Sequence, residues 1–210
     1  MTKYVNLRPA RVPVFKFGVA IAFAMFSTLI LWSKPSLASN SEMLIDDFSD
    51  QTLTSALGTK WRNVNDTVMG GVSSSSVTHH KSERHNCLHL AGDVRLENNG
   101  GFIQAALDLS VDGKLLDASA FTGIRLIALG NEETYSVHLR TPDNTRPWQS
   151  YRANFNAQAE PQTINIPFSS FKPYKTDVPL DNKNLRRIGI VGIGRAFQAD
   201  LKICQISLYR

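Results

Sequence analysis

Residues 134–156 read TYSVHLRTPDNTRPWQSYRANFN, which is two alternating runs joined by a polar stretch with two prolines. Every second residue of each run is apolar or aromatic: Tyr135, Val137 and Leu139 in the first, and Tyr151, Ala153 and Phe155 in the second. Successive side chains of a β-strand point to opposite faces, so a period of two indicates a half-buried strand. The segment therefore predicts two strands, each with one face toward a core.

Seven further runs rich in β-branched and aromatic residues lie on both sides of this segment, separated by stretches with Gly, Pro, Asn and Asp. They are Met43–Phe48, Cys87–Leu96, Gly101–Leu109, Gly123–Leu129, Thr163–Phe168, Arg187–Ile193 and Leu201–Tyr209. Strands without crossover helices are typical of antiparallel sheets. We therefore expect an all-β sandwich whose first and last strands are neighbours. The serines at 73–76 are expected to form a flexible loop.

The charge balance narrows the choice of partner. The chain has 210 residues, with 23 Lys and Arg against 18 Asp and Glu, and a net charge of +5. This excess lies in residues 1–38, which hold five basic residues and no acidic one, so the rest of the chain is neutral. A neutral body lacks the field that gathers phosphates, which argues against nucleic acid as the partner. A hydrophobic share of 42% also argues against intrinsic disorder.

The first 38 residues have the order of an export signal. Four basic residues precede an apolar run at 17–32, and the small residues Ser36 and Ala38 follow it, as a signal peptidase requires. The run is shorter than the roughly 20 residues that span a bilayer. We therefore expect residues 1–38 to be a cleaved signal peptide and 39–210 to be a single exported domain, periplasmic or otherwise extracytoplasmic. The alternative is an uncleaved membrane anchor at 17–32, which would be the only membrane contact.

Two glycine-containing segments resemble cofactor or catalytic motifs without completing them. Gly192 and Gly194 begin a dinucleotide fingerprint, but Phe197 stands where the last glycine belongs, and too few residues follow for a helix and a returning strand. We expect Gly189, Gly192 and Gly194 to allow close packing of an inner strand. Residues 71–75 (GVSSS) lack the last glycine of a nucleophile elbow. We predict no catalytic residue and no cofactor, and therefore no enzyme.

Four of the five histidines lie between positions 79 and 89. In this segment His85, Cys87 and His89 would share one strand face, and imidazole with thiolate suits zinc or copper. Because Leu88 and Leu90 are better core residues, we expect instead a histidine-rich loop or surface facing solvent, and no metal site.

Two smaller groups of residues leave alternatives open. Asp46, Asp47 and Asp50 offer oxygen ligands for a structural calcium ion, although a strand end followed by a turn is the favoured interpretation. Cys87 and Cys204 each lie within a predicted strand, 117 positions apart. Buried free thiols are the expectation. A disulfide is the alternative, and it requires that the two strands be neighbours or face each other.

Two glycine-rich segments have the composition of ordered loops. Residues 61–73 (WRNVNDTVMGGVS) place an aromatic anchor before turn-forming Asn and Asp and a double glycine, which permits positive φ. Residues 97–102 (ENNGGF) repeat this order between two predicted strands, where an Asn-Gly pair favours a tight hairpin. We expect the two loops to pack on each other at one end of the sandwich, either as plain turns or as a surface for a ligand or partner.

These loops also carry a resemblance to a known family. Trp61 with residues 65–73, then 96–102, Tyr151-x-Ala153-x-Phe155, 166–173 (IPFSSFKP) and 185–189 (LRRIG) are similar, in this order, to the signature of the complex I intermediate-associated protein 30 family. The resemblance extends over about residues 44–209 and implies a jelly-roll β-sandwich like that of galactose-binding domains. It also implies a chaperone-like role without catalysis, because members of the family assist the assembly of respiratory complex I or of photosystems.

The favoured hypothesis is a non-catalytic binding protein, a chaperone-like or assembly factor for a membrane-complex or envelope protein. Its predicted contact residues come from the two loops: Trp61, Asn65, Asp66, Met69, Gly70, Gly71, Asn98, Asn99, Gly100, Gly101 and Phe102. The alternative is a carbohydrate-binding module, because sugar sites combine aromatic faces with planar polar side chains. Its platform would consist of Tyr135, His138, Arg140, Trp148, Arg152 and Asn154.

Overall fold

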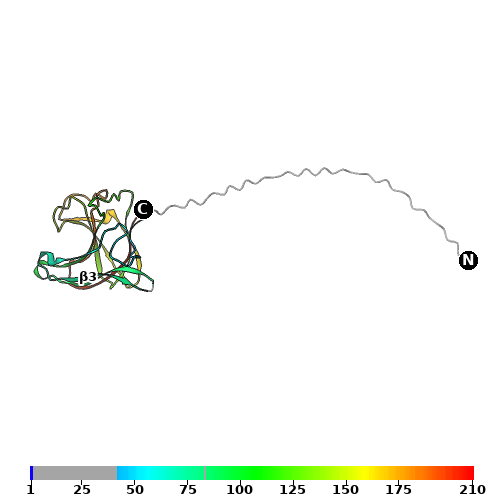
Figure 1. Ribbon diagram of the computed structural model, residues 1–210, viewed down its shortest axis with the longest axis horizontal. Coiled ribbons are helices and arrows are strands. Elements are labelled where there is room, and N and C mark those ends of the chain that lie inside the picture. Colours follow the sequence, from blue (N-terminus) through cyan, green and yellow to red (C-terminus); the bar gives the residue numbers. More distant parts are fainter. Residues whose placement is uncertain (2–41, 83) are drawn as a thin grey trace. The chain divides into compact units, whose positions relative to one another are not determined.

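The computed structural model describes Met1, residues 42–82 and residues 84–210. The predicted signal peptide at 1–38, with its apolar run at 17–32, lies outside the described residues apart from Met1. The described part is built from strands, and its helices are three short 3-10 turns (Figure 1): η1 (Asp66–Met69), η2 (Glu97–Asn99) and η3 (Phe168–Ser170). Within these ranges no helix is long and apolar enough to cross a membrane.

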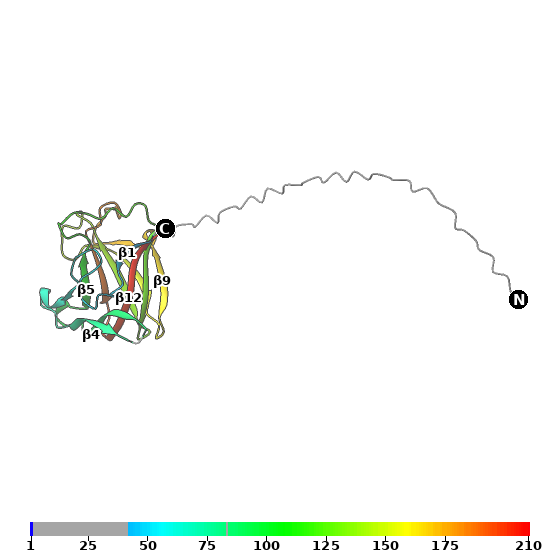
Figure 2. The same ribbon diagram turned by 45° about the vertical axis from the view of Figure 1, so that its right-hand side comes forward.

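The strands form two antiparallel sheets that pack face to face. The first sheet has the order β3-β4-β12-β6-β9, with β1 also paired to β12; β1, β4, β9 and β12 are labelled in Figure 2. Its strands are β1 (Met43–Asp46), β3 (Ser74–Lys81), β4 (Asn86–Val94), β6 (Gly123–Gly130), β9 (Gln162–Pro167) and β12 (Phe197–Tyr209). The second sheet has the order β10-β8-β7-β11-β5-β2. Its strands are β2 (Arg62–Asn65), β5 (Phe102–Asp108), β7 (Thr134–Arg140), β8 (Ser150–Asn156), β10 (Lys172–Tyr174) and β11 (Arg187–Ile193).

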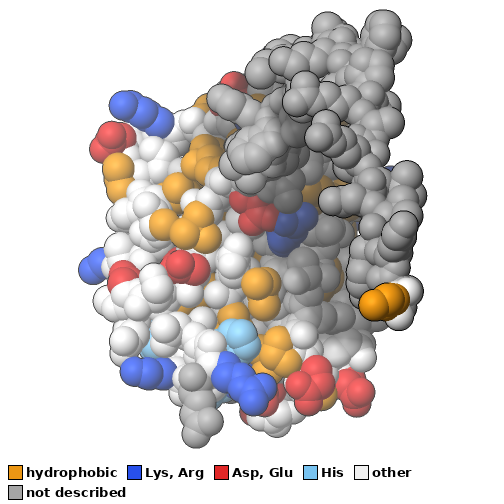
Figure 3. Space-filling view, turned by 90° about the vertical axis from the view of Figure 1, so that its right-hand side faces the viewer, with side chains coloured by type: hydrophobic (Ala, Val, Ile, Leu, Met, Phe, Trp, Pro, Cys, Tyr) orange, Lys and Arg blue, Asp and Glu red, His pale blue; other side chains and the backbone are white. Residues whose placement is uncertain are grey.

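The hydrophobic core lies between the sheets because the strands turn their apolar positions inward. Val137 and Leu139 of β7 meet residues such as Leu88 and Leu90 of β4 in one buried cluster. The predicted runs at 134–140, 150–156 and 187–193 coincide with β7, β8 and β11. The all-β jelly-roll sandwich is thereby confirmed, and β1 and β12 are neighbours as predicted. The face seen in Figure 3 mixes hydrophobic, acidic and basic side chains, which agrees with a neutral body.

Three strands lie where the sequence pattern indicates none. The serines at 73–76 do not form a flexible loop, because Ser74, Ser75 and Ser76 belong to β3, which pairs with β4 along its length. β2 is polar at three of its four positions and shows no apolar alternation. β10 contains Pro173, which is tolerated because β10 is an edge strand.

The predicted hairpin at 97–102 is wrong. β4 and β5 flank this segment but belong to different sheets, so the segment connects the two layers. β4 pairs with β3 and β12, and β5 pairs with β11 and β2, so distant partners override the local turn signal of Asn99 and Gly100.

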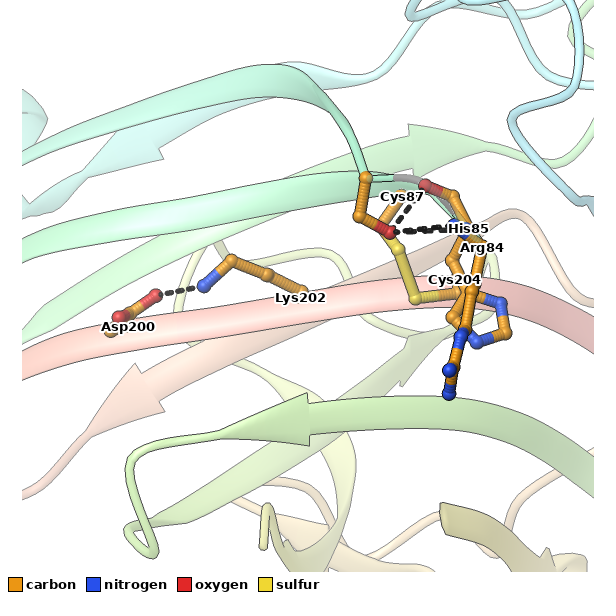
Figure 4. The surroundings of a disulfide bond; sticks show 7 residues. Arg84, His85, Cys87, Asp200, Lys202 and Cys204 are labelled. Carbon is orange, nitrogen blue, oxygen red and sulfur yellow. Dashed lines mark hydrogen bonds and ion pairs between the residues drawn. A yellow bond between two sulfur atoms is a disulfide. The ribbon is translucent and has the colours of Figure 1, made fainter. Parts of the chain in front are cut away.

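Cys87 and Cys204 form a disulfide, which corrects the expectation of free thiols (Figure 4). The bond joins β4 to β12, which are neighbours in the first sheet, where Leu88 pairs with Ile203. Figure 4 shows Arg84 and His85 of the β3–β4 turn beside the bond. Because Cys87 is bonded to Cys204, it is not free to bind zinc or copper.

The histidines do not share one loop. His79 and His80 lie in β3 and His89 lies in β4, all of them half-buried. His89 Nε2 is 2.8 Å from Asp200 Oδ1 on the neighbouring strand β12. In the described part of the chain, no group of three His, Cys, Asp or Glu side chains is placed to hold a metal ion.

Candidate functional site

The outer face of the second sheet, turned away from the core, holds a groove of about 500 Å³. Its floor is formed by outward positions of β5, β11, β7 and β8, among them Ala106, Val191 and His138. Phe102 and Met69 of the two glycine-rich segments line it near the β2 and β5 edge of the sheet. The groove therefore places predicted loop residues and predicted sugar-platform residues around one space.

Trp148 and Tyr174 line the groove toward the opposite edge of the sheet, near β8 and β10. Both aromatic side chains are exposed, Trp148 by 51% and Tyr174 by 39%. They offer flat apolar surfaces beside the polar side chains of the floor. This combination can hold a ligand that has both apolar and hydrogen-bonding faces.

The floor follows from the alternation along the strands. In β7 the inward residues Val137 and Leu139 leave His138 on the outer face. β11 lies between β7 and β5, and its Gly189 leaves room for the Gln104 side chain, which a Cβ at position 189 would overlap. The expectation of close packing is confirmed for Gly189 and Gly192, whereas Gly194 follows the strand at φ 89° with open space around its Cα.

Asp66 ties the two glycine-rich loops together. Its side chain is fully buried, and Oδ1 accepts a hydrogen bond from the Ser73 N–H at 2.9 Å. Oδ2 accepts hydrogen bonds from the Ser73 hydroxyl and the Gly101 N–H, both at 2.5 Å, and from the Phe102 N–H at 3.3 Å. Burial acts to raise the pKa of Asp66, but these hydrogen bonds outweigh it and hold the pKa below its ordinary value. We call Asp66 with these three partners the Asp66 junction.

The junction confirms that the two loops pack on each other, and it corrects the assignment of Asp66 as a contact residue. Asp66 is buried and cannot touch a ligand. Gly71 and Gly100 serve the same packing, because a Cβ on either would overlap the Asp66 carboxylate. Gly70 at φ 88° and Gly101 at φ 124° adopt the positive φ that the double glycines predict.

Two predicted aromatic contact residues lie in the core. Trp61 is buried, and its Nε1 donates a hydrogen bond to Asp46 Oδ2 at 2.8 Å. Tyr135 is buried because it shares the inward face of β7 with Val137, and its hydroxyl donates to Asn131 Oδ1 at 2.7 Å. The prediction of Trp61 as a loop contact residue and of Tyr135 as part of the sugar platform is therefore wrong.

The other predicted loop residues divide between the groove and the turns. Asn65 precedes η1 and accepts a hydrogen bond from the Thr67 hydroxyl. Asn98, at φ 58°, lies in η2 outside the groove lining, and the backbone of Asn99 completes η2. Of the predicted platform, Asn154 lies outside this groove and lines an adjoining hollow.

The three aspartates near the start of the domain each complete a turn, as favoured. Asp46 accepts the Phe48 N–H at 2.9 Å, and burial raises the pKa of Asp46. Asp47 accepts the Ser49 N–H, and Asp50 accepts the Thr52 N–H. One oxygen of each carboxylate is thus bound to the local backbone, and the other oxygen of Asp46 accepts the hydrogen bond from Trp61.

His138 has an unsatisfied ring nitrogen at the floor of the groove. The side chain is 8% exposed, and its buried Nε2 has no hydrogen-bond partner among the described residues. Burial, with a smaller effect of the Arg152 guanidinium, lowers the pKa of His138 to about 3. The neutral ring can donate or accept one hydrogen bond to a ligand.

Because the folded protein keeps His138 neutral, acidification should lower the free energy of unfolding. The unfolded chain gains a proton on His138 near pH 6.5, whereas the folded chain resists protonation down to about pH 3, so stability falls as the pH drops through this window. Between pH 7 and pH 4.5 the loss is on the order of 2 kcal/mol, measurable by urea unfolding. His138→Gln should flatten this part of the curve; parallel curves for the two proteins would contradict the prediction.

Arg140 and Arg152 bring positive charge to the groove. The Arg152 Nε donates to Ser150 Oγ at 3.0 Å, and its Cζ lies 3.4 Å from the centre of the Tyr174 ring. The Arg140 guanidinium donates to the main-chain oxygen of Arg146 at 2.7 Å. Burial lowers the pKa of both arginines, yet a guanidinium stays charged at ordinary pH. Neither forms an ion pair with an acidic side chain in the described ranges.

Gln104, Tyr174 and Arg187 are among the groove residues that sequence reasoning missed. Tyr174 belongs to a three-residue edge strand, and only the pairing of β10 with β8 brings it over Arg152. The alternation of β5 could have placed Gln104 on the outer face, but nothing local shows that Gly189 opens space beside it.

The sequence profile of a family described as complex I intermediate-associated protein 30 matches residues 47–203. Among proteins with curated descriptions, none matches the chain.

Two solved structures of similar fold are family 11 carbohydrate-binding modules from Clostridium thermocellum. One, in complex with a β-1,3-1,4-mixed-linked tetrasaccharide, has a TM-score of 0.61 at 16% identity, and the match covers 80% of this chain and 95% of that one. The other, from the cellulosomal cellulase Lic26A-Cel5E, has a TM-score of 0.62 at 17% identity, with 82% and 96% covered. At this identity the likeness extends to the fold alone.

Proposed function

Because the chain belongs to the complex I intermediate-associated protein 30 family, we propose that it is a non-catalytic binding protein whose ligand occupies the groove of the second sheet. The ligand that the groove favours is a carbohydrate. The observation that carries this proposal is the pairing of exposed Trp148 and Tyr174 with polar Gln104 and His138 around one space.

Sugar rings need this combination of surfaces. Their C–H faces stack on aromatic rings, while their hydroxyls need directional hydrogen-bond partners. The half-buried Gln104 amide is such a partner. The Nε2 of His138 is buried without a partner among the described residues, and a hydroxyl that reached the groove floor would satisfy it. The fold shared with the family 11 modules, one of which is described in complex with a tetrasaccharide, makes carbohydrate a natural first ligand to test.

We place this activity outside the cytoplasm. The order of residues 1–38 supports export, and the Cys87–Cys204 disulfide fits an oxidising compartment such as the periplasm.

Substitution of Trp148 should separate groove binding from folding. Trp148→Ala is expected to weaken binding of the β-1,3-1,4-mixed-linked tetrasaccharide, or of the best soluble cell-wall oligosaccharide on an array, at least about tenfold in calorimetric titration, since one stacking face is lost. Val111→Ala, at an exposed apolar position outside the groove, is the matched control and should bind as wild type does. If wild type binds no oligosaccharide at millimolar concentration, the carbohydrate proposal is wrong.

A protein partner is the second candidate, and the apolar side chains at the loop end of the groove favour it. Val68, Met69, Val72 and Leu96 are all exposed on or beside the two glycine-rich loops. Exposed apolar side chains of this kind are typical of contact surfaces for proteins. The expected partner is a membrane-complex or envelope protein, in a chaperone-like or assembly role.

Retrieval of binding partners from envelope extracts distinguishes the two candidates. A Val68→Ser/Met69→Ser variant should lose a subunit that wild type retrieves from envelope extracts, whereas Trp148→Ala should retain it. Retrieval of the same subunit by both variants would argue against this loop surface.

A further inference from the structure

We propose that the groove selects anionic oligosaccharides, bearing carboxylate or sulfate groups, over neutral ones of the same backbone. This inference rests on the carbohydrate function proposed above and specifies its substrate class. It follows from the positions of the basic side chains on the second sheet and from the lack of acidic partners for several of them among the described residues.

The groove does not end at Arg152. A second hollow of about 520 Å³ adjoins it on the same face and shares Arg152, Ile193 and Gly194 with it. Lys172 and Arg195 line this second hollow. The two spaces together form a continuous track along the outer face of the sheet.

The lining of this track is basic. It contains Arg140, Arg152, Lys172, Arg187 and Arg195, and among the described residues that line it there is no Asp or Glu. Since the body of the chain is neutral overall, this positive charge reflects where charges are placed and not their total.

Only part of this charge is compensated within the chain. Arg187 pairs with Asp108 at 2.6 Å, although Asp108 also pairs with Arg62, and Arg195 pairs with Glu133. In contrast, Arg140, Arg152 and Lys172 have no ion pair among the described residues.

The two uncompensated arginines are also partly withdrawn from water. Arg152 is half-buried beneath Tyr174, and Arg140 has a buried Nε without a hydrogen-bond partner in the described part of the chain. Burial lowers the pKa of both arginines, because removing a positive charge from water costs free energy. A bound carboxylate or sulfate would offset this cost.

A neutral sugar leaves the same charges uncompensated. An anionic group accepts charge-assisted hydrogen bonds from a guanidinium, which are roughly twice as strong as neutral ones and often bidentate. Tyr174 holds the Arg152 guanidinium by cation–π contact, so little side-chain freedom remains to be lost on binding. An acidic ring stacked near Trp148 would present its charge to Arg152, because both residues line the one groove.

Matched pairs of oligosaccharides test this selectivity. We would titrate the protein with β-1,4-linked tetraglucuronate against cellotetraose, and with tetragalacturonate against its methyl ester, adding sulfated cellotetraose to distinguish carboxylate from sulfate. At least one acidic member should bind tenfold or more tightly than its neutral partner. That preference should shrink as salt is raised from 50 to 300 mM.

Arg152→Gln should reduce the acidic preference, measured as the ratio of the affinities for the acidic and the neutral partner, to less than threefold. Arg84→Gln, which removes the same charge from the exposed β3–β4 turn of the other sheet, should leave the preference intact. Lys172→Gln, at an exposed position of the track, replaces Arg152→Gln if that variant fails to fold.

The outcomes separate this inference from the function on which it rests. If neutral partners, or the mixed-linked tetrasaccharide, bind as tightly as acidic ones, the selectivity is wrong and the carbohydrate function stands. If no oligosaccharide binds, both are wrong. Equal binding of single-stranded oligothymidylate would also overturn it, because the track would then bind anions without regard to sugar.

Discussion

Asp66→Ala is expected to lower the free energy of unfolding by about 3–5 kcal/mol, although the residue touches no ligand. The fully buried carboxylate accepts hydrogen bonds from Ser73, Gly101 and Phe102, so its removal leaves several buried donors without a partner at once. Urea denaturation followed by circular dichroism measures the loss. The variant should also bind groove ligands less tightly, because Gly101 and Phe102 line the groove.

Asp50→Ala is the matched control. Asp50 also accepts two hydrogen bonds, from the Thr52 N–H and the Thr52 hydroxyl, but it is exposed. Water replaces the carboxylate at such a site, so the expected loss of stability is a small fraction of that for Asp66→Ala. Equal losses for the two variants would show that the junction has no special weight in the fold.

Loss of the disulfide is expected to lower the free energy of unfolding by about 3–4 kcal/mol. The bond between Cys87 and Cys204 closes a loop with a separation of 117 positions, and a long loop restricts the unfolded chain strongly. A Cys87→Ala/Cys204→Ala variant, compared with wild type in urea, measures the effect.

A reductant provides the control within the same experiment. It should lower the stability of wild type toward that of the double variant and leave the variant itself unchanged. If reductant leaves wild type as stable as before, the bond does not contribute to folding, and the argument for an oxidising compartment loses its main structural support.

Much of the fold could be predicted because most of its strands have a recognisable local sequence pattern. β7, β8 and β11 alternate clearly or carry continuous β-branched residues, and their bounds agree with the prediction. Strand pairing, in contrast, depends on residues far apart in the chain. Both the disulfide and the wrongly predicted hairpin at 97–102 depend on the pairing of β4 with β12. No local sequence pattern indicates that pairing.

The groove shows the same division. Phe102 and Met69 come from the predicted loops, and His138, Arg140, Arg152 and Trp148 come from the predicted platform, yet the sequence gives no reason to join the two sets. The sequence pattern predicts Asp66 at the surface, because Asn and Asp in a glycine-rich loop usually cap exposed turns. Its burial is visible only once Gly101 and Ser73 are seen to converge on it.

The Cys87–Cys204 bond belongs to the first sheet, whereas the groove belongs to the second. The covalent link and the proposed binding groove thus lie in opposite layers of the sandwich. Substitutions on the outer face of the second sheet can therefore change ligand preference without disturbing the disulfide-linked first sheet. Proteins that share this fold can differ in the ligands they bind.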